Sequence, residues 1–117
     1  MSYETVTMGA RVGEFLLSEA NGERSREEVT LAATTVALSA GTVLGKVTAT
    51  GYYAPYAAGA ADGTETAAAI LYGNKPVSTA VQPAAVVVRD AEVIGELLVG
   101  SDAAAEVELL AQGIVVR

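Results

Sequence analysis

Short apolar runs, each ended within a few residues by a turn-forming residue, are the feature that most limits what this chain can fold into. Val29-Thr30-Leu31 alternates as a short strand, and a stretch rich in β-branched residues, 42–48, follows the turn at Ala40-Gly41. Three consecutive valines, Val86-Val87-Val88, come after Pro83 and fit a buried strand far better than a helix. The pattern predicts one β-rich domain with many turns.

One helical segment stands out near the C-terminus. Ser101 is a suitable N-cap, Asp102 puts negative charge in the first turn, and Gly113 suits the C′ position. The apolar spacing predicts one buried helix face, with Glu106 and Glu108 toward solvent. That predicted buried face consists of Ala103, Val107, Leu110 and Ala111. We expect Ile114-Val115-Val116 to close the chain as a strand, so the fold class is α+β, β-rich, with one main helix near residues 102–112.

Composition and charge narrow the possible partners. Hydrophobic residues make up 51% of the 117 residues, charged residues 18%, and the mean hydropathy is +0.38, which excludes disorder of the low-hydrophobicity, high-charge kind. A short chain this apolar has apolar surface to spare, and an oligomer or a partner is a natural place to bury it. Seven basic residues, scattered singly, oppose 14 acidic ones and give a net charge of −7. Nucleic-acid binding needs clustered Lys and Arg, so we expect no nucleic-acid partner.

Candidate motifs for chemistry are few. The chain has no Cys and no His, which excludes the usual zinc sites, thiol nucleophiles and Ser-His-Asp triads. Residues 41–46 fail as a phosphate-binding loop, because only three residues separate Gly41 from Gly45 and Val47 follows the Lys. Asp90 and Glu92 would project from one face of a strand, but without a third ligand a solvated strand face is the better interpretation. We therefore predict no catalytic, cofactor or metal site.

Two further expectations concern the tyrosines and the cellular location. Tyr52, Tyr53 and Tyr56 have only Lys46 close by in sequence, which favours core or interface packing over base stacking. The start of the chain, 1–4, lacks a basic region followed by an apolar stretch, so we expect no signal peptide. No apolar run approaches the length of a membrane span, so we expect synthesis in the cytoplasm and no membrane partner.

The N-terminal segment carries a strand pattern without a partner. Thr5-Val6-Thr7-Met8 alternates, yet nothing nearby forms an obvious hairpin with it. Either this is a frayed terminus, or it is an arm that pairs with another chain.

Several segments in series resemble the lambda-type head decoration protein family of tailed phages. The resemblance covers nearly everything from Gly13 onward, in the right order. The chain departs from the family pattern after 97–101, where many relatives carry a Trp-Pro pair and this chain has no Trp. The segments that carry the resemblance are 13–22, 25–31, 40–47, 53–56, 62–64, 67–72 and 85–93.

The resemblance implies a small loop-rich, β-tulip-like domain over residues 14–117, preceded by a flexible capsid-binding arm over 1–13. It also implies a homotrimer on the outer surface of the expanded head, where it binds the major capsid protein and stabilises the shell against packaged DNA. The arm would add a strand to the capsid protein. The alternatives are another virion subunit, such as a tail tube or fibre, or a small β-rich enzyme using Asp90 and Glu92. The expected capsid-binding residues are Tyr3, Thr5, Val6, Thr7 and Met8.

Overall fold

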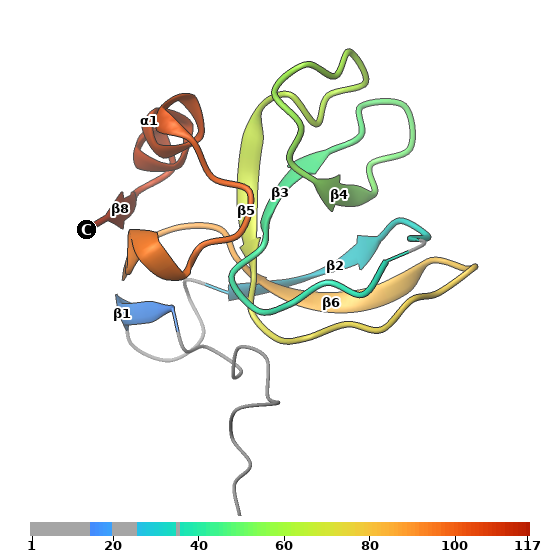
Figure 1. Ribbon diagram of the computed structural model, residues 1–117, viewed down its shortest axis with the longest axis horizontal. Coiled ribbons are helices and arrows are strands. Elements are labelled where there is room, and N and C mark those ends of the chain that lie inside the picture. Colours follow the sequence, from blue (N-terminus) through green and yellow to red (C-terminus); the bar gives the residue numbers. More distant parts are fainter. Residues whose placement is uncertain (1–14, 20–25, 35) are drawn as a thin grey trace, which may run out of the picture.

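A computed structural model describes residues 15–19, 26–34 and 36–117. Within these residues the chain forms short strands, one 3-10 helix and one α-helix, which confirms the predicted β-rich α+β class (Figure 1). In chain order the elements are β1 (Leu16–Glu19), β2 (Arg26–Leu31), β3 (Val43–Lys46), β4 (Tyr53–Pro55), β5 (Ala67–Leu71), β6 (Gln82–Val87), β7 (Ala91–Val93), η2 (Gly95–Leu97), α1 (Ala103–Ala111) and β8 (Ile114–Val116).

Five strands close into a small barrel in the order β2-β4-β3-β5-β6. β2 and β6 pair antiparallel along their whole lengths, from Arg26 opposite Val87 to Leu31 opposite Gln82. A short parallel pairing, Leu31 opposite Tyr53, joins β2 to β4 and completes the circle. The predicted strands over 29–31, 42–48 and 86–88 therefore exist as parts of β2, β3 and β6, although β3 ends at Lys46 and β6 at Val87.

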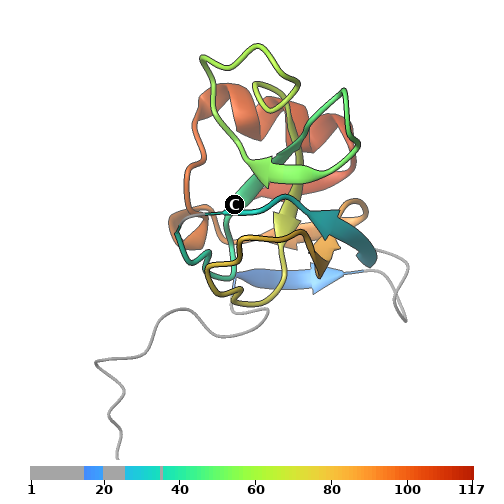
Figure 2. The same cartoon turned by 90° about the vertical axis from the view of Figure 1, so that its right-hand side faces the viewer.

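A second layer covers one side of the barrel. It consists of α1 and a three-stranded sheet in the order β1-β7-β8, in which β1 runs antiparallel and β8 parallel to β7. Figures 1 and 2 show α1 and this sheet together on the same side of the barrel. The final strand predicted over Ile114 to Val116 is confirmed as β8.

Two hydrophobic clusters follow from this arrangement. The first draws only on the barrel strands and the segments beside them, with Leu31, Leu44 and Leu71 fully buried, and it fills the barrel. The second lies between the barrel and the second layer and includes Phe15 and Ile114. Neighbouring residues of β3, β5 and β6 alternate between the two clusters, since successive side chains on a strand point to opposite faces. A wall buried on both faces explains why these strands read as continuous apolar runs.

The predicted buried face of the helix is wrong. The residues of α1 that are fully buried are Ala105 and Leu109, whereas Val107 is 68% exposed and Leu110 59% exposed. Ala103 and Ala111 are exposed as well.

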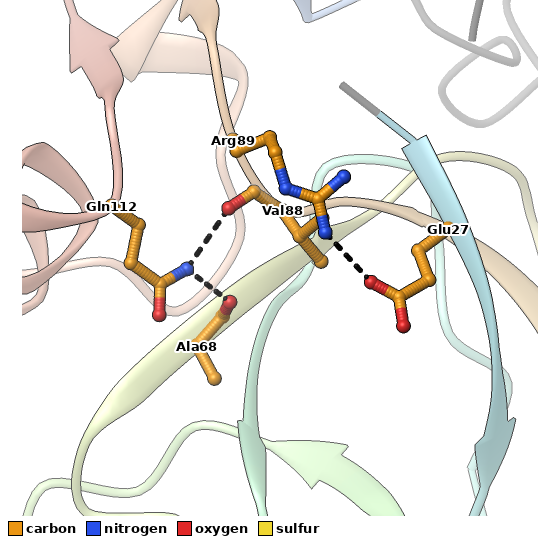
Figure 3. A network of polar contacts seen from close by, with 5 residues as sticks. All are labelled: Glu27, Ala68, Val88, Arg89 and Gln112. Carbon is orange, nitrogen blue, oxygen red and sulfur yellow. Dashed lines mark hydrogen bonds and ion pairs between the residues drawn. The ribbon is translucent and has the colours of Figure 1, made fainter. Parts of the chain in front are cut away.

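Polar side chains explain why the other face turns inward. Glu108 Oε1 accepts a hydrogen bond from the backbone N–H of Ala67 at 2.7 Å. Gln112 Nε2 donates to the carbonyl oxygens of Ala68 and Val88, at 2.6 and 3.1 Å (Figure 3). These backbone groups lie where β6 has already ended beside β5, so the helix supplies partners that the sheet does not. Glu108, predicted to face solvent, is thus half-buried and bonded to the barrel.

The ends of the helix follow the sequence signals closely, with one shift. The N-cap is Asp102, not Ser101, because an Asp102 carboxylate oxygen accepts from the N–H of Ala105 at 2.8 Å. Gly113 follows the C-cap Gln112 with φ of +90°, which confirms its predicted role in ending the helix.

Candidate interaction surfaces

The predicted arm residues Tyr3, Thr5, Val6, Thr7 and Met8 lie outside the described residues. The described chain begins at Phe15, whose carbonyl oxygen accepts a hydrogen bond from the N–H of Ile94 at 2.8 Å. Leu16 then starts β1, which among the described residues pairs on one side only, with β7. The segment before residue 15 therefore joins the domain at an open edge of the three-stranded sheet.

The two carboxylates considered as a pair do not share a strand. Asp90 lies in a bend before β7, with φ of +54°, so strand alternation does not place it on the face of Glu92. Glu92 belongs to β7, and its Oε2 accepts from Arg117 Nη2 at 3.1 Å. In the described part of the chain no group of three or more His, Cys, Asp or Glu side chains is placed to hold a metal.

Another carboxylate, that of Asp62, forms hydrogen bonds within a turn. Asp62 Oδ1 accepts from the Thr64 hydroxyl at 2.6 Å and from the Thr64 N–H at 3.0 Å. These two hydrogen bonds to the charged form lower the pKa of Asp62 below its ordinary value. The side chain therefore helps to fix the geometry of this turn.

Two of the three tyrosines singled out in the sequence pack against the cores. Tyr53 lies against the cluster that fills the barrel, and burial, together with the negative charge of Glu27, raises the pKa of its hydroxyl. Tyr56 lies against the second cluster, and its hydroxyl group donates a hydrogen bond to Asp102 Oδ1 at 3.0 Å. Partial burial and this hydrogen bond raise the pKa of Tyr56. Both side chains thus support packing, as predicted.

One apolar surface, which we call the helix groove, lies between α1 and β8. It is a hollow of about 380 Å³ in which Glu106 is the one charged side chain. Its exposed wall is the helix stripe that the sequence predicted to be buried, centred on Val107 and Leu110. The residues of the helix groove are Ala103, Glu106, Val107, Leu110, Val115 and Val116.

A second apolar surface, which we call the loop surface, lies on the loops that follow β2 and β5 and includes Val99 from the segment between η2 and α1. The N–H groups of Leu38 and Lys75 donate to each other's carbonyl oxygens, at 2.8 and 2.7 Å, so the two loops lie side by side. Two adjoining hollows, of about 270 and 440 Å³, share Ala37 and Leu38. The loop surface consists of Val36, Ala37, Leu38, Lys75, Pro76 and Val99.

Sequence reasoning did not identify the loop surface. Val36 is 59% exposed although it belongs to the apolar run Val36-Ala37-Leu38, and only Leu38 of the three is buried. The available signal was an apolar run inside a turn-rich segment, which by itself does not distinguish core from surface. The helices of the described part, η2 and α1, are too short to cross a membrane.

A small β-barrel domain whose described surface offers apolar contact areas fits the class of proteins that bind a partner through such surfaces. The family model for bacteriophage lambda head decoration protein D matches residues 5–114. The chain therefore belongs to this family of structural proteins that decorate the phage capsid, as the resemblance implied. Searches of the curated proteins and of the solved structures found no match.

Proposed function

We propose that the protein binds the outer surface of the expanded phage head as a homotrimer and stabilises the shell against the pressure of packaged DNA. The observation that carries this proposal is the family match, which extends over residues 5–114 and therefore includes most of the arm. It favours the head over a tail tube or fibre as the site of action. The net charge of −7 also fits a protein that contacts other proteins rather than DNA.

The partner is the major capsid protein, and residues 1–13 are the arm that binds it. The alternation over Thr5 to Met8 suits an added strand, in which backbone hydrogen bonds give affinity and every second side chain gives fit. The arm precedes β1, an edge strand of the described sheet, so it can leave the domain without breaking a described pairing. Three arms on one trimer bind far more tightly than one arm, provided that all three engage together.

The first experiment adds the purified protein to expanded, undecorated capsids and then heats them. We expect saturable binding and survival of the decorated capsids at temperatures that disrupt the bare ones. Unexpanded heads, tested in parallel, show whether binding requires expansion. A protein that does not bind, or that binds without raising the survival of the capsids, contradicts the proposal.

The second experiment tests the arm. Deletion of residues 1–13 is expected to leave a folded trimer that has lost most of its capsid affinity. Two double variants give a sharper result, because alternate residues of a strand face opposite ways. Val6→Asp with Met8→Asp, and Thr5→Asp with Thr7→Asp, should weaken binding unequally. Equal capsid binding by the deletion variant and the full chain would show that residues 1–13 do not contribute to capsid binding.

A further inference from the structure

We infer that the helix groove of one copy contacts the loop surface of the next copy, and that these two surfaces are the two halves of the interface between subunits. This inference rests on the proposed homotrimer and specifies where its subunits meet. It names the partner of both surfaces as a second copy of this chain.

The helix groove has the properties of one half of an interface. Val107 and Leu110 lie one turn apart on α1 and are 68% and 59% exposed, although large apolar side chains are more often buried. Val115 and Val116 of β8 form the other wall. The fold does not require Val107 and Leu110 to be exposed or buried, since α1 is anchored by the buried side chains of Ala105 and Leu109. A stripe of this kind gains most from burial against another apolar surface.

The loop surface provides a matching half. Val36 and Val99, 59% and 47% exposed, both line a hollow that Leu38 also lines. The paired hydrogen bonds between Leu38 and Lys75 fix the two loops, so the hollow has a defined shape before any partner arrives. In Figure 1 the loops that follow β2 and β5 lie below the barrel, whereas α1 and β8 lie at its left, so the two surfaces draw on elements at different sides of the domain.

Charge argues for a second copy as the occupant. Each copy carries a net charge of −7, so two copies repel each other unless they meet where charge is low or complementary. The helix groove contains one charged residue, Glu106, and the loop surface contains one, Lys75. No ion pair joins either of these side chains to another described residue. Placing one surface on the other brings Glu106 toward the partner's Lys75.

Symmetry argues for pairing the two different surfaces with each other. A two-fold contact uses the same patch twice, whereas a closed ring of three copies requires each subunit to present two different patches that fit one another. The described surface offers two such patches, both apolar and oppositely charged at one point. A contact between two helix grooves would instead place the Glu106 side chains of the two copies near each other, where their like charges repel.

The first test reverses the two charges. Glu106→Lys and Lys75→Glu should each weaken association by about fivefold to tenfold, because each places like charges across the interface. The chain that carries both substitutions should recover most of the lost affinity. Glu28→Lys, at an exposed position of β2 outside both surfaces, changes the net charge by the same amount as Glu106→Lys and serves as the control for that variant. Sedimentation across a range of concentrations measures association. Two single variants that do not weaken the trimer overturn the inference.

The second test mixes two defective chains. Val107→Glu and Val36→Glu should each weaken association by about tenfold to a hundredfold, leaving monomers at micromolar concentration. Each variant keeps the surface that the other has lost. A mixture should therefore form a two-chain species held by one intact contact, and no closed trimer. Circular dichroism of each variant confirms that it is folded.

The outcomes separate this inference from the function on which it rests. If the unaltered protein is a monomer at all concentrations, the proposed trimer itself is wrong. If the unaltered protein is a trimer and Val36→Glu is still a trimer, the trimer stands and this interface is wrong. If both variants dissociate but their mixture forms no complex, the surfaces do not pair with each other, which also overturns the inference.

Discussion

Gly45 lies where a strand and a turn pass too closely for a side chain. A Cβ atom at this position would lie 2.5 Å from Thr64 Cα and 2.8 Å from the Thr64 carbonyl oxygen, both backbone atoms. Gly45→Ala should therefore lower the free energy of unfolding by about 1–3 kcal/mol or more, through overpacking. Gly59→Ala is the matched control, because nothing lies within 4 Å of its Cβ position. Urea unfolding measures both, and equal stability of the two variants would contradict the close approach.

Asp102 and Ser101, neighbours at the start of α1, should differ sharply in their contributions to stability. Asp102 caps the helix and accepts the Tyr56 hydroxyl, so Asp102→Ala should cost about 1–2 kcal/mol. The buried Ser101 hydroxyl oxygen has no hydrogen-bond partner among the described residues, so Ser101→Ala should cost nothing measurable. Tyr56→Phe separates the capping bond from the tyrosine bond. Thermal denaturation checks the order, and a larger loss for Ser101→Ala would show that the sequence-based cap was correct.

At the scale of elements, the orientation of α1 can be tested with two adjacent leucines. Leu109 is fully buried, and Leu109→Ala should lower the free energy of unfolding by about 2–5 kcal/mol. Leu110 is exposed in the single copy, so Leu110→Ala should cost much less at low protein concentration. If Leu110 contacts a second copy, its cost should grow as concentration rises, because association stabilises the folded state. If Leu110→Ala lowered the free energy of unfolding more than Leu109→Ala at all concentrations, the helix face predicted from the sequence would be the buried one.

The helix also shows what could be predicted from the sequence. Its existence, its end at Gly113 and the strand that follows depend on local signals, and the structure confirms them. Its buried face depends on Glu108 and Gln112, which bond to backbone groups of β5 and of Val88, the residue after β6, far away in sequence. A rule that counts apolar spacing cannot include such partners. It therefore selected the face that the structure leaves exposed.

The same limit applies to the barrel and to the interaction surfaces. The individual strands could be predicted, but closure depends on the pairing of β2 with β6, which follows only after β3, β4 and β5. The loop surface exists only because Leu38 meets Lys75 across two loops. Asp90 and Glu92 were considered as a pair through strand alternation, which the bend at Asp90 removes. Long-range contacts decide the first two of these cases, and a local bend in the backbone decides the third.

At the scale of the whole molecule, charge sets how association should respond to salt. Copies that each carry −7 repel one another, and salt screens this repulsion over distances beyond about 8–10 Å. Raising the salt concentration from 0.05 to about 0.5 M should therefore strengthen association by a few-fold. The proposed contact between Glu106 and Lys75 opposes this trend, since salt also weakens attraction. The chain with Glu106→Gln and Lys75→Gln keeps the same net charge but lacks that attraction, so its association should strengthen more with salt. Sedimentation at the two salt concentrations measures both chains, and association that weakens with salt in both would show that attraction between charges, rather than apolar contact, holds the copies together.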